Sequence, residues 1–137
     1  MSRLVAWSVH LSFLAAGITG CVYGYMRLVL EPADEFSILH HPDEPGWRAA
    51  HIVLSPILLF ACGLIWRTHV WARVAGGWEE RRWTGLALFA LLLPMALSGY
   101  LLQVSEAENL RTLWSWTHAI TGAIWVLAYA GHLLRRD

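Results

Sequence analysis

Charged residues are scarce in this chain of 137 residues. They make up 15% of it, lysine is absent, and ten arginines balance ten acids to a formal net charge of zero. A small soluble domain rarely carries so little charge, because it has a large surface to cover with water-compatible groups. The zero net charge also excludes the basic character that binds a nucleic-acid backbone. With only two cysteines, the chain is not a disulfide-stapled secreted domain.

Hydrophobic residues instead make up 57% of the chain. Four stretches are long and apolar enough to cross a bilayer, which requires about 20 residues at about 1.5 Å each. They are residues 4–28, 48–66, 84–103 and 114–134. The alternating pattern of a membrane β-barrel is absent, so the spans are predicted to be helices. The sequence therefore predicts an all-α integral membrane protein, a four-helix bundle that forms a single transmembrane domain over residues 1–137.

Arginine is distributed unequally between the two sides of the predicted membrane. The side that holds both termini has Arg3, Arg67, Arg73, Arg81, Arg82, Arg135 and Arg136, and the other side has Arg27, Arg48 and Arg111. The positive-inside rule therefore predicts that both termini are cytoplasmic. The longest connection, residues 31–46, is predicted to be an ordered or docking loop in the periplasm.

Five of the seven histidines lie in or beside the predicted spans: His10, His51, His69, His118 and His132. An ionisable residue there is costly and is a functional candidate, and a hydrogen bond to a neighbouring helix is the alternative. At ~1.5 Å per residue from the centre of each span, His51 and His118 lie roughly 9 and 10 Å toward the outside. His10 and His132 lie roughly as far toward the cytoplasm, and His69 lies ~18 Å from the centre.

These depths predict two pairs of histidines, one in each leaflet. Two neutral histidines from facing helices fill both axial positions of a haem iron, which then accepts and releases single electrons. A glycine on the same helix face lets a flat group approach the backbone, although ordinary small-residue packing is the alternative. The glycines in question are Gly17, Gly24 and Gly122. The span 84–103 has no histidine and is predicted to serve only as a packing helix.

The four spans, with one histidine in the first, one in the second and His-x13-His in the fourth, resemble the bacterial di-haem cytochrome b family. This family includes the membrane subunits of formate dehydrogenases and nickel–iron hydrogenases, and small stand-alone cytochromes b. The resemblance implies that His51 and His118 hold one haem b on the periplasmic side, and His10 and His132 a second on the cytoplasmic side. It also implies electron relay between quinone and a periplasmic redox protein, within a hetero-oligomeric respiratory complex.

Two other interpretations of the histidines stay open. In the first, the chain is a non-haem transport or scaffold subunit whose histidines relay protons or hold helices together. No aspartate or glutamate lies within the spans to partner them, which disfavours a relay. In the second, the haems are kept but His69 replaces His10 as a ligand.

Two polar segments outside the spans are candidate contact regions. The predicted cytoplasmic loop 68–83 carries His69, Arg73, Glu79 and Glu80, and it is either a quinone-binding region or a solvated basic interface. The acidic periplasmic loop carries His40 and His41, which either contact a partner or a metal or have no role beyond the loop.

Overall fold

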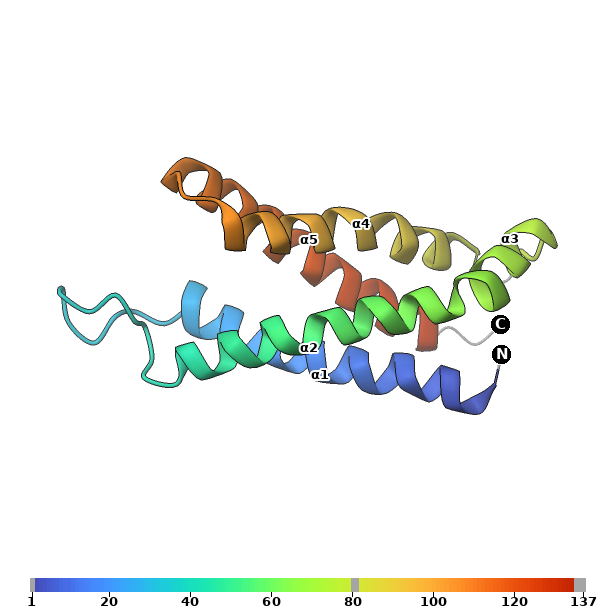
Figure 1. The fold of residues 1–137 in the computed structure, drawn as a ribbon, viewed down its shortest axis with the longest axis horizontal. Helices are drawn as coiled ribbons and strands as arrows, with labels where there is room; N and C mark the ends of the chain where they lie inside the picture. The colour runs from blue at the N-terminus through green and yellow to red at the C-terminus, as the bar shows by residue number, and fades with distance from the viewer. Residues whose placement is uncertain (1, 80–81, 135–137) are drawn as a thin grey trace. The chain divides into compact units, whose positions relative to one another are not determined.

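The computed structural model describes residues 2–79 and 82–134, and within these ranges it contains helices and no strand. The long helices are α1 (Arg3–Leu28), α2 (Glu44–Ile65), α4 (Arg82–Val104) and α5 (Glu108–Leu134). A π-helix, η1 (Trp66–Trp71), and the short α3 (Ala72–Ala75) follow α2 directly (Figure 1). The predicted all-α class is confirmed. Of the residues that the sequence argument used, Glu80, Arg81, Arg135 and Arg136 lie outside the described ranges.

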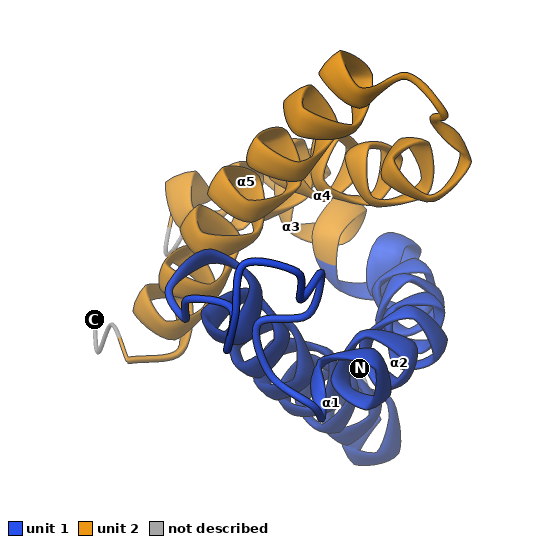
Figure 2. Cartoon of the chain, turned by 90° about the vertical axis from the view of Figure 1, so that its left-hand side faces the viewer, with its two compact units in different colours: residues 1–69 blue, residues 70–137 orange. Residues whose placement is uncertain are grey.

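The chain forms two compact units, each a hairpin of long helices (Figure 2). In the N-terminal hairpin, residues 1–69, α1 packs along α2, and in the C-terminal hairpin, residues 70–137, α4 packs along α5. A bundle of all four helices and a single domain stay predictions from the sequence.

The helix starts follow from capping and from the charges of the first turns. Ser2 caps α1, because its side chain accepts a hydrogen bond from the backbone N–H of Val5 at 3.3 Å. α2 begins at Glu44 with a proline in its first turn, where no intrahelical N–H bond is needed. Glu44 and Glu108 each place a negative charge in a first turn, which the helix dipole favours. Both helices therefore start before their apolar spans do.

The second helical segment is longer than the sequence analysis predicted. A loop was expected over residues 68–83, but a helical run extends from Glu44 to Ala75. Residues 64–75 contain neither glycine nor proline, so nothing in them breaks a helix. The run ends at Gly76 and Gly77, where Gly77 has a φ of 67° that glycine adopts readily.

Among the described residues, three helical segments are long and apolar enough to cross a membrane: Arg3–Leu28, Glu44–Ala75 and Arg82–Val104. The fourth predicted span forms a helix, α5, but is not among these three. It carries two histidines and three tryptophans, which lower its mean hydropathy.

Most large apolar side chains of the described residues lie on the surface. Leu127 is 72% exposed, Phe60 is 67% exposed and Leu93 is 65% exposed. The buried apolar residues in these ranges are Val9, Ala16, Leu58, Ala61, Trp125 and Tyr129. Burying apolar surface stabilises a protein in water by about 25 cal/mol per Å², and contiguous exposed apolar surface marks contact with a partner or a membrane. These helix faces therefore suit a lipid environment.

Hydrogen bonds and one ion pair fix the connection between α1 and α2 to the ends of both helices. Glu44 is buried, and its carboxylate accepts the backbone N–H of His40 at 3.0 Å and lies 3.6 Å from the guanidinium of Arg27. The ring Nδ1 of His40 lies 2.6 Å from the carbonyl oxygen of Leu30, and Arg27 donates to the carbonyl of Ile38 at 3.2 Å. These contacts join the end of α1, the loop and the start of α2.

Candidate functional site

In the N-terminal hairpin, the imidazole of His51 on α2 lies against α1. Its Nδ1 is 3.0 Å from the carbonyl oxygen of Ala16 and 3.4 Å from the hydroxyl of Thr19. A carbonyl only accepts hydrogen bonds, so Nδ1 carries the proton and donates it. The ring occupies the space that a side chain at Gly20 would need, because a Cβ there would lie 2.7 Å from Cε1 of His51. Gly20 is therefore required for this close approach.

The C-terminal hairpin holds His118 of α5 against α4 in the same way. Nδ1 of His118 lies 2.8 Å from the carbonyl oxygen of Met95, so it also donates. A Cβ at Gly99 would lie 3.0 Å from Cε1 and 3.1 Å from Nδ1 of this ring. A side chain larger than hydrogen at Gly99 would therefore press on the imidazole.

These two sets of contacts, which we call the histidine frames, share their spacing along the helix. In each, the accepting carbonyl precedes the glycine by four residues, and a buried hydroxyl residue stands directly before the glycine. The hydroxyls bond to their own helices: Thr19 donates to Ala15 or Ala16, and Ser98 to Pro94 or Met95. A short hydroxyl residue and a glycine give the ring access to the backbone, so His51 and His118 have equivalent surroundings in the two hairpins.

His132 meets a related but different partner on α4. Its Nδ1 lies 2.9 Å from the hydroxyl of Thr84, and a Cβ at Gly85 would lie 3.6 Å from its Cε1, which is an ordinary contact. Thr84–Gly85 precedes Ser98–Gly99 by 14 residues, and His132 follows His118 by the same interval. Since α4 and α5 run antiparallel in a hairpin, two hydroxyl–glycine pairs of α4 face the two histidines of α5.

His10 and His69 lie in the N-terminal hairpin, and both are half-buried. The His10 ring contacts the Trp7 ring edge-on, with centroids 5.9 Å apart and planes at 82°. His69 lies within η1, and π-helical turns are common at functional sites.

The three glycines proposed from the sequence as haem contacts have no histidine ring within 4 Å of their Cβ positions. A Cβ at Gly17 would meet Phe13 at 3.9 Å, and one at Gly24 or at Gly122 would meet nothing within 4 Å. There is open space beside the last two, and a role for all three in haem binding stays a prediction.

Trp125 packs between the helices of the C-terminal hairpin. It is 4% exposed, its indole N–H donates to the carbonyl of Leu88 at 2.8 Å, and its ring stacks on Tyr129 with centroids 5.5 Å apart. These contacts give this tryptophan a packing role between α4 and α5.

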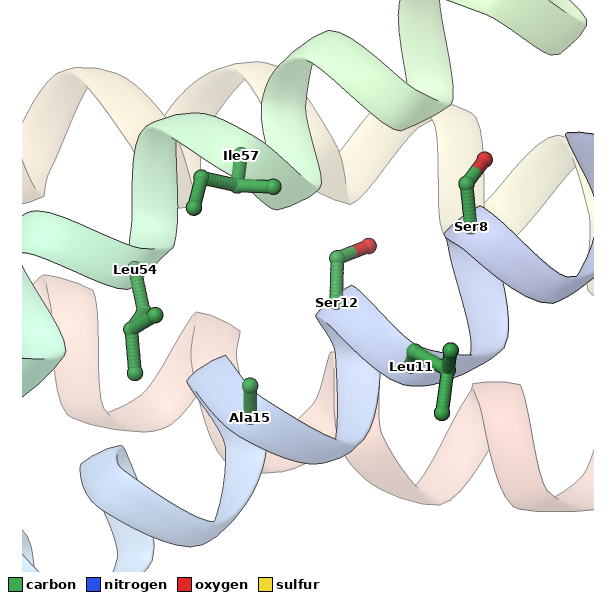
Figure 3. A pocket seen from close by; sticks show the side chains of 6 residues that line it. All are labelled: Ser8, Leu11, Ser12, Ala15, Leu54 and Ile57. Atoms are coloured by element: carbon green, nitrogen blue, oxygen red, sulfur yellow. The ribbon is translucent and has the colours of Figure 1, made fainter.

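A hollow of about 320 Å³ lies between α1 and α2 (Figure 3). It is lined by Ser8, Leu11, Ser12, Ala15, Leu54 and Ile57. The hydroxyls of Ser8 and Ser12 donate to carbonyls of their own helix, at 2.8 and 3.1 Å. The lining is therefore mainly hydrocarbon and contains no ionisable group.

The donor set fits axial ligation of a haem iron. When Nδ1–H donates to a backbone carbonyl, Nε2 carries the lone pair, and this is the tautomer and second-shell contact typical of metal-binding histidines. Residues 2–79 and 82–134 contain no cluster of three or more metal-ligating side chains, and haem ligation by two axial imidazoles does not use one. Each predicted haem pair takes one histidine from each hairpin, so the pairing itself stays a prediction.

Comparison with known proteins gives no match: no family model, no curated protein and no solved structure is similar to the chain. The histidine frames are therefore the strongest observation on function.

The residues on α1 and α4 that contact or adjoin the histidine rings were not predicted from the sequence. They are Thr19, Gly20, Thr84, Gly85 and Gly99, together with the carbonyls of Ala16 and Met95. The matched interval of 14 residues in Thr84–Gly85 to Ser98–Gly99 and in His118 to His132 was a signal that could have found them. The span 84–103 therefore contacts both histidines of α5, through the hydroxyl of Thr84 and the carbonyl of Met95.

Proposed function

We propose that the chain is a di-haem cytochrome b of the bacterial inner membrane, a four-helix bundle with both termini in the cytoplasm. It relays electrons between quinone and a periplasmic redox partner, as the membrane subunit of a hetero-oligomeric respiratory complex. The observation that carries this proposal is the pair of equivalent histidine frames at His51 and His118.

The membrane location is supported by three helical segments of sufficient length and hydropathy and by their exposed apolar faces. The orientation rests on the excess of arginine on the side of the termini. α5 is less apolar than the other long helices, but helices with polar residues cross membranes when those residues face other helices or a cofactor.

At the periplasmic side, His51 and His118 would bind one haem through Nε2. The carbonyls of Ala16 and Met95 hold the Nδ1 protons and fix the tautomer. Gly20 and Gly99 let each ring lie close to the neighbouring helix, which limits its rotation. When bound, haem b would supply one-electron transfer, and His51 and His118 would hold its iron.

At the cytoplasmic side, His132 and His10 would bind the second haem, and His69 is the rival of His10. Thr84 orients His132 by a contact to Nδ1, and Trp7 contacts the edge of His10. The helical run through η1 gives His69 a helical position rather than the loop position expected from the sequence.

Residues 68–83 are the proposed quinone-binding region, and a solvated basic interface is its alternative. Arg73 lies over the ring of Trp78, 5.1 Å from its centroid, so this cation–π contact engages its charge. Of the other three candidate side chains of this region, those of His69 and Glu79 lie within the described residues.

A second candidate function is a non-haem transport or scaffold subunit in which the histidines join helices. It is favoured by the same contacts, because His51, His118 and His132 each bond to the neighbouring helix of their own hairpin. Visible absorbance separates the two candidates.

The proposed function predicts a b-type reduced-minus-oxidised spectrum. Protein purified in detergent from bacteria that synthesise haem should contain two haems per chain, measured as the pyridine haemochrome against protein concentration. Protein without haem from such cells would contradict the di-haem proposal and leave the scaffold candidate.

Alanine substitutions separate His10 from His69 as the fourth ligand. We expect His10→Ala to reduce haem content from two per chain to one and His69→Ala to leave it at two, because only His10 matches the depth of His132. The reverse result would assign the ligand to His69. His41→Ala, outside the spans, serves as the control for nonspecific loss of haem.

A further inference from the structure

The connection between α1 and α2, residues 29–43, has two large apolar side chains on its surface. Phe36 is 88% exposed and Ile38 is 85% exposed. Both lie outside the helical segments long enough to span a membrane, the first of which ends at Leu28 and the second of which begins at Glu44. The connection extends beyond the ends of both helices (Figure 1). Contact with lipid hydrocarbon accounts for the exposed apolar faces of the helices, but it does not account for these two residues.

Hydrogen bonds fix the backbone that carries the two side chains. The N–H of Phe36 donates to the carboxylate of Asp34 at 2.9 Å, and the N–H of Ser37 donates to the carbonyl of Asp34 at 3.2 Å. Arg27 donates to the carbonyl of Ile38 at 3.2 Å. Exposing apolar surface to water is unfavourable, and a fixed backbone loses little conformational entropy when a partner covers it. Residues 29–43 therefore suit contact with another molecule.

The same connection is acidic. It contains four exposed carboxylates: Glu31, Asp34, Glu35 and Asp43. The sequence has no arginine or lysine between Arg27 and Arg48. Protein interfaces have apolar residues at the centre and polar residues at the rim, and opposite charges on two surfaces speed their association. These carboxylates would repel anionic lipid headgroups, so the charge favours a basic protein over a bilayer surface.

We propose that residues 29–43 are the docking surface for a periplasmic redox protein whose contact face has an apolar patch ringed by lysine or arginine. Phe36 and Ile38 are the apolar contacts at the centre of this surface, and Glu31 and Glu35 attract the basic ring. The inference rests on the proposed function for the side of the membrane and for the redox character of the partner.

Binding kinetics test the docking surface. The probe is a small basic c-type cytochrome, whose exposed haem edge is ringed by lysines, and the full-length protein is held in nanodiscs at low ionic strength. We expect the probe to bind, and Phe36→Ser with Ile38→Ser should raise the dissociation rate roughly tenfold. Glu31→Gln with Glu35→Gln should instead lower the association rate and its dependence on salt. Asp34 is left unchanged because it accepts the N–H of Phe36.

Two controls make the result specific. Leu4→Ser removes a side chain that is 84% exposed but belongs to α1, and it should change neither rate. The same cytochrome with its lysines acetylated has lost the basic ring, and it should not bind measurably to the wild-type protein.

Each failure has a distinct meaning. If the wild-type protein has two haems but does not bind the basic cytochrome, or binds it equally well without Phe36 and Ile38, this inference is wrong and the proposed function stands. Binding in detergent that is lost in nanodiscs would place the two side chains in the bilayer and overturn the inference. A dimer of the chain that Phe36→Ser with Ile38→Ser dissociates would also overturn it. Protein without haem that still binds through Phe36 and Ile38 would contradict the proposed function, and the redox character of the partner with it, but not the docking surface.

Discussion

Replacing His51 by alanine is expected to lower the haem content from two per chain to one, and replacing His118 should have the same effect. Each substitution removes one axial ligand of the same proposed haem, and its Nδ1 contact to Ala16 or Met95 is lost with it. The measurement is the pyridine haemochrome per chain, with the b-type spectrum of the remaining haem as a check on folding.

The double variant tests the pairing itself. If His51 and His118 hold one haem, then His51→Ala with His118→Ala should still leave one haem per chain. If they serve different haems, the same double variant should leave none, which would contradict the pairing. His41→Ala is a matched control, because His41 contacts Asp43 in the connecting loop at 3.8 Å and lies outside the spans.

Replacing Gly20 by alanine is expected to displace the imidazole of His51 and to reduce occupancy of the periplasmic-side haem by at least half. The added Cβ would lie 2.7 Å from Cε1 and 3.0 Å from Nδ1, so the ring must move and its bond to Ala16 must weaken. Overpacking of this kind costs about 1–3 kcal/mol. Haem content and the thermal unfolding midpoint in detergent measure the two effects, and Gly99→Ala should act alike at His118.

Gly63→Ala on α2 is the matched control, because a Cβ at Gly63 meets nothing within 4 Å. It should retain two haems and an unchanged unfolding midpoint. Should Gly20→Ala and Gly99→Ala both behave like Gly63→Ala, the histidine frames would not orient the ligands as proposed.

The helices were predictable from the sequence because a long apolar segment has little choice of secondary structure other than a helix. The bounds of α1 and α4 lie within a few residues of the predicted spans. The extension of α2 through η1 to Ala75 differs from the predicted loop 68–83, because the polar and aromatic residues of this segment predict a loop by their low hydropathy. In these residues the absence of glycine and proline had more influence on local structure than hydropathy did.

The candidate site was predictable only in part. Histidine depth follows from counting residues along a span, and this singled out His10, His51, His118 and His132. Which side chain or carbonyl each ring touches depends on how two helices rotate against one another, and the sequence of one helix does not contain this information. The contacts of Thr19 with His51 and of Thr84 with His132 therefore depend on how α1 packs against α2 and how α4 packs against α5.

The contacts of each histidine frame form within a single hairpin, and this has a consequence for the order of folding and haem binding in the proposed cytochrome. The apoprotein can set the tautomer of His51 and His118 before any cofactor arrives, since the contacts to Ala16 and Met95 require only the neighbouring helix. Preorganised ligands lose less conformational entropy when they bind. Haem capture in this protein would then be a late step, in which the iron joins two imidazoles that are already oriented.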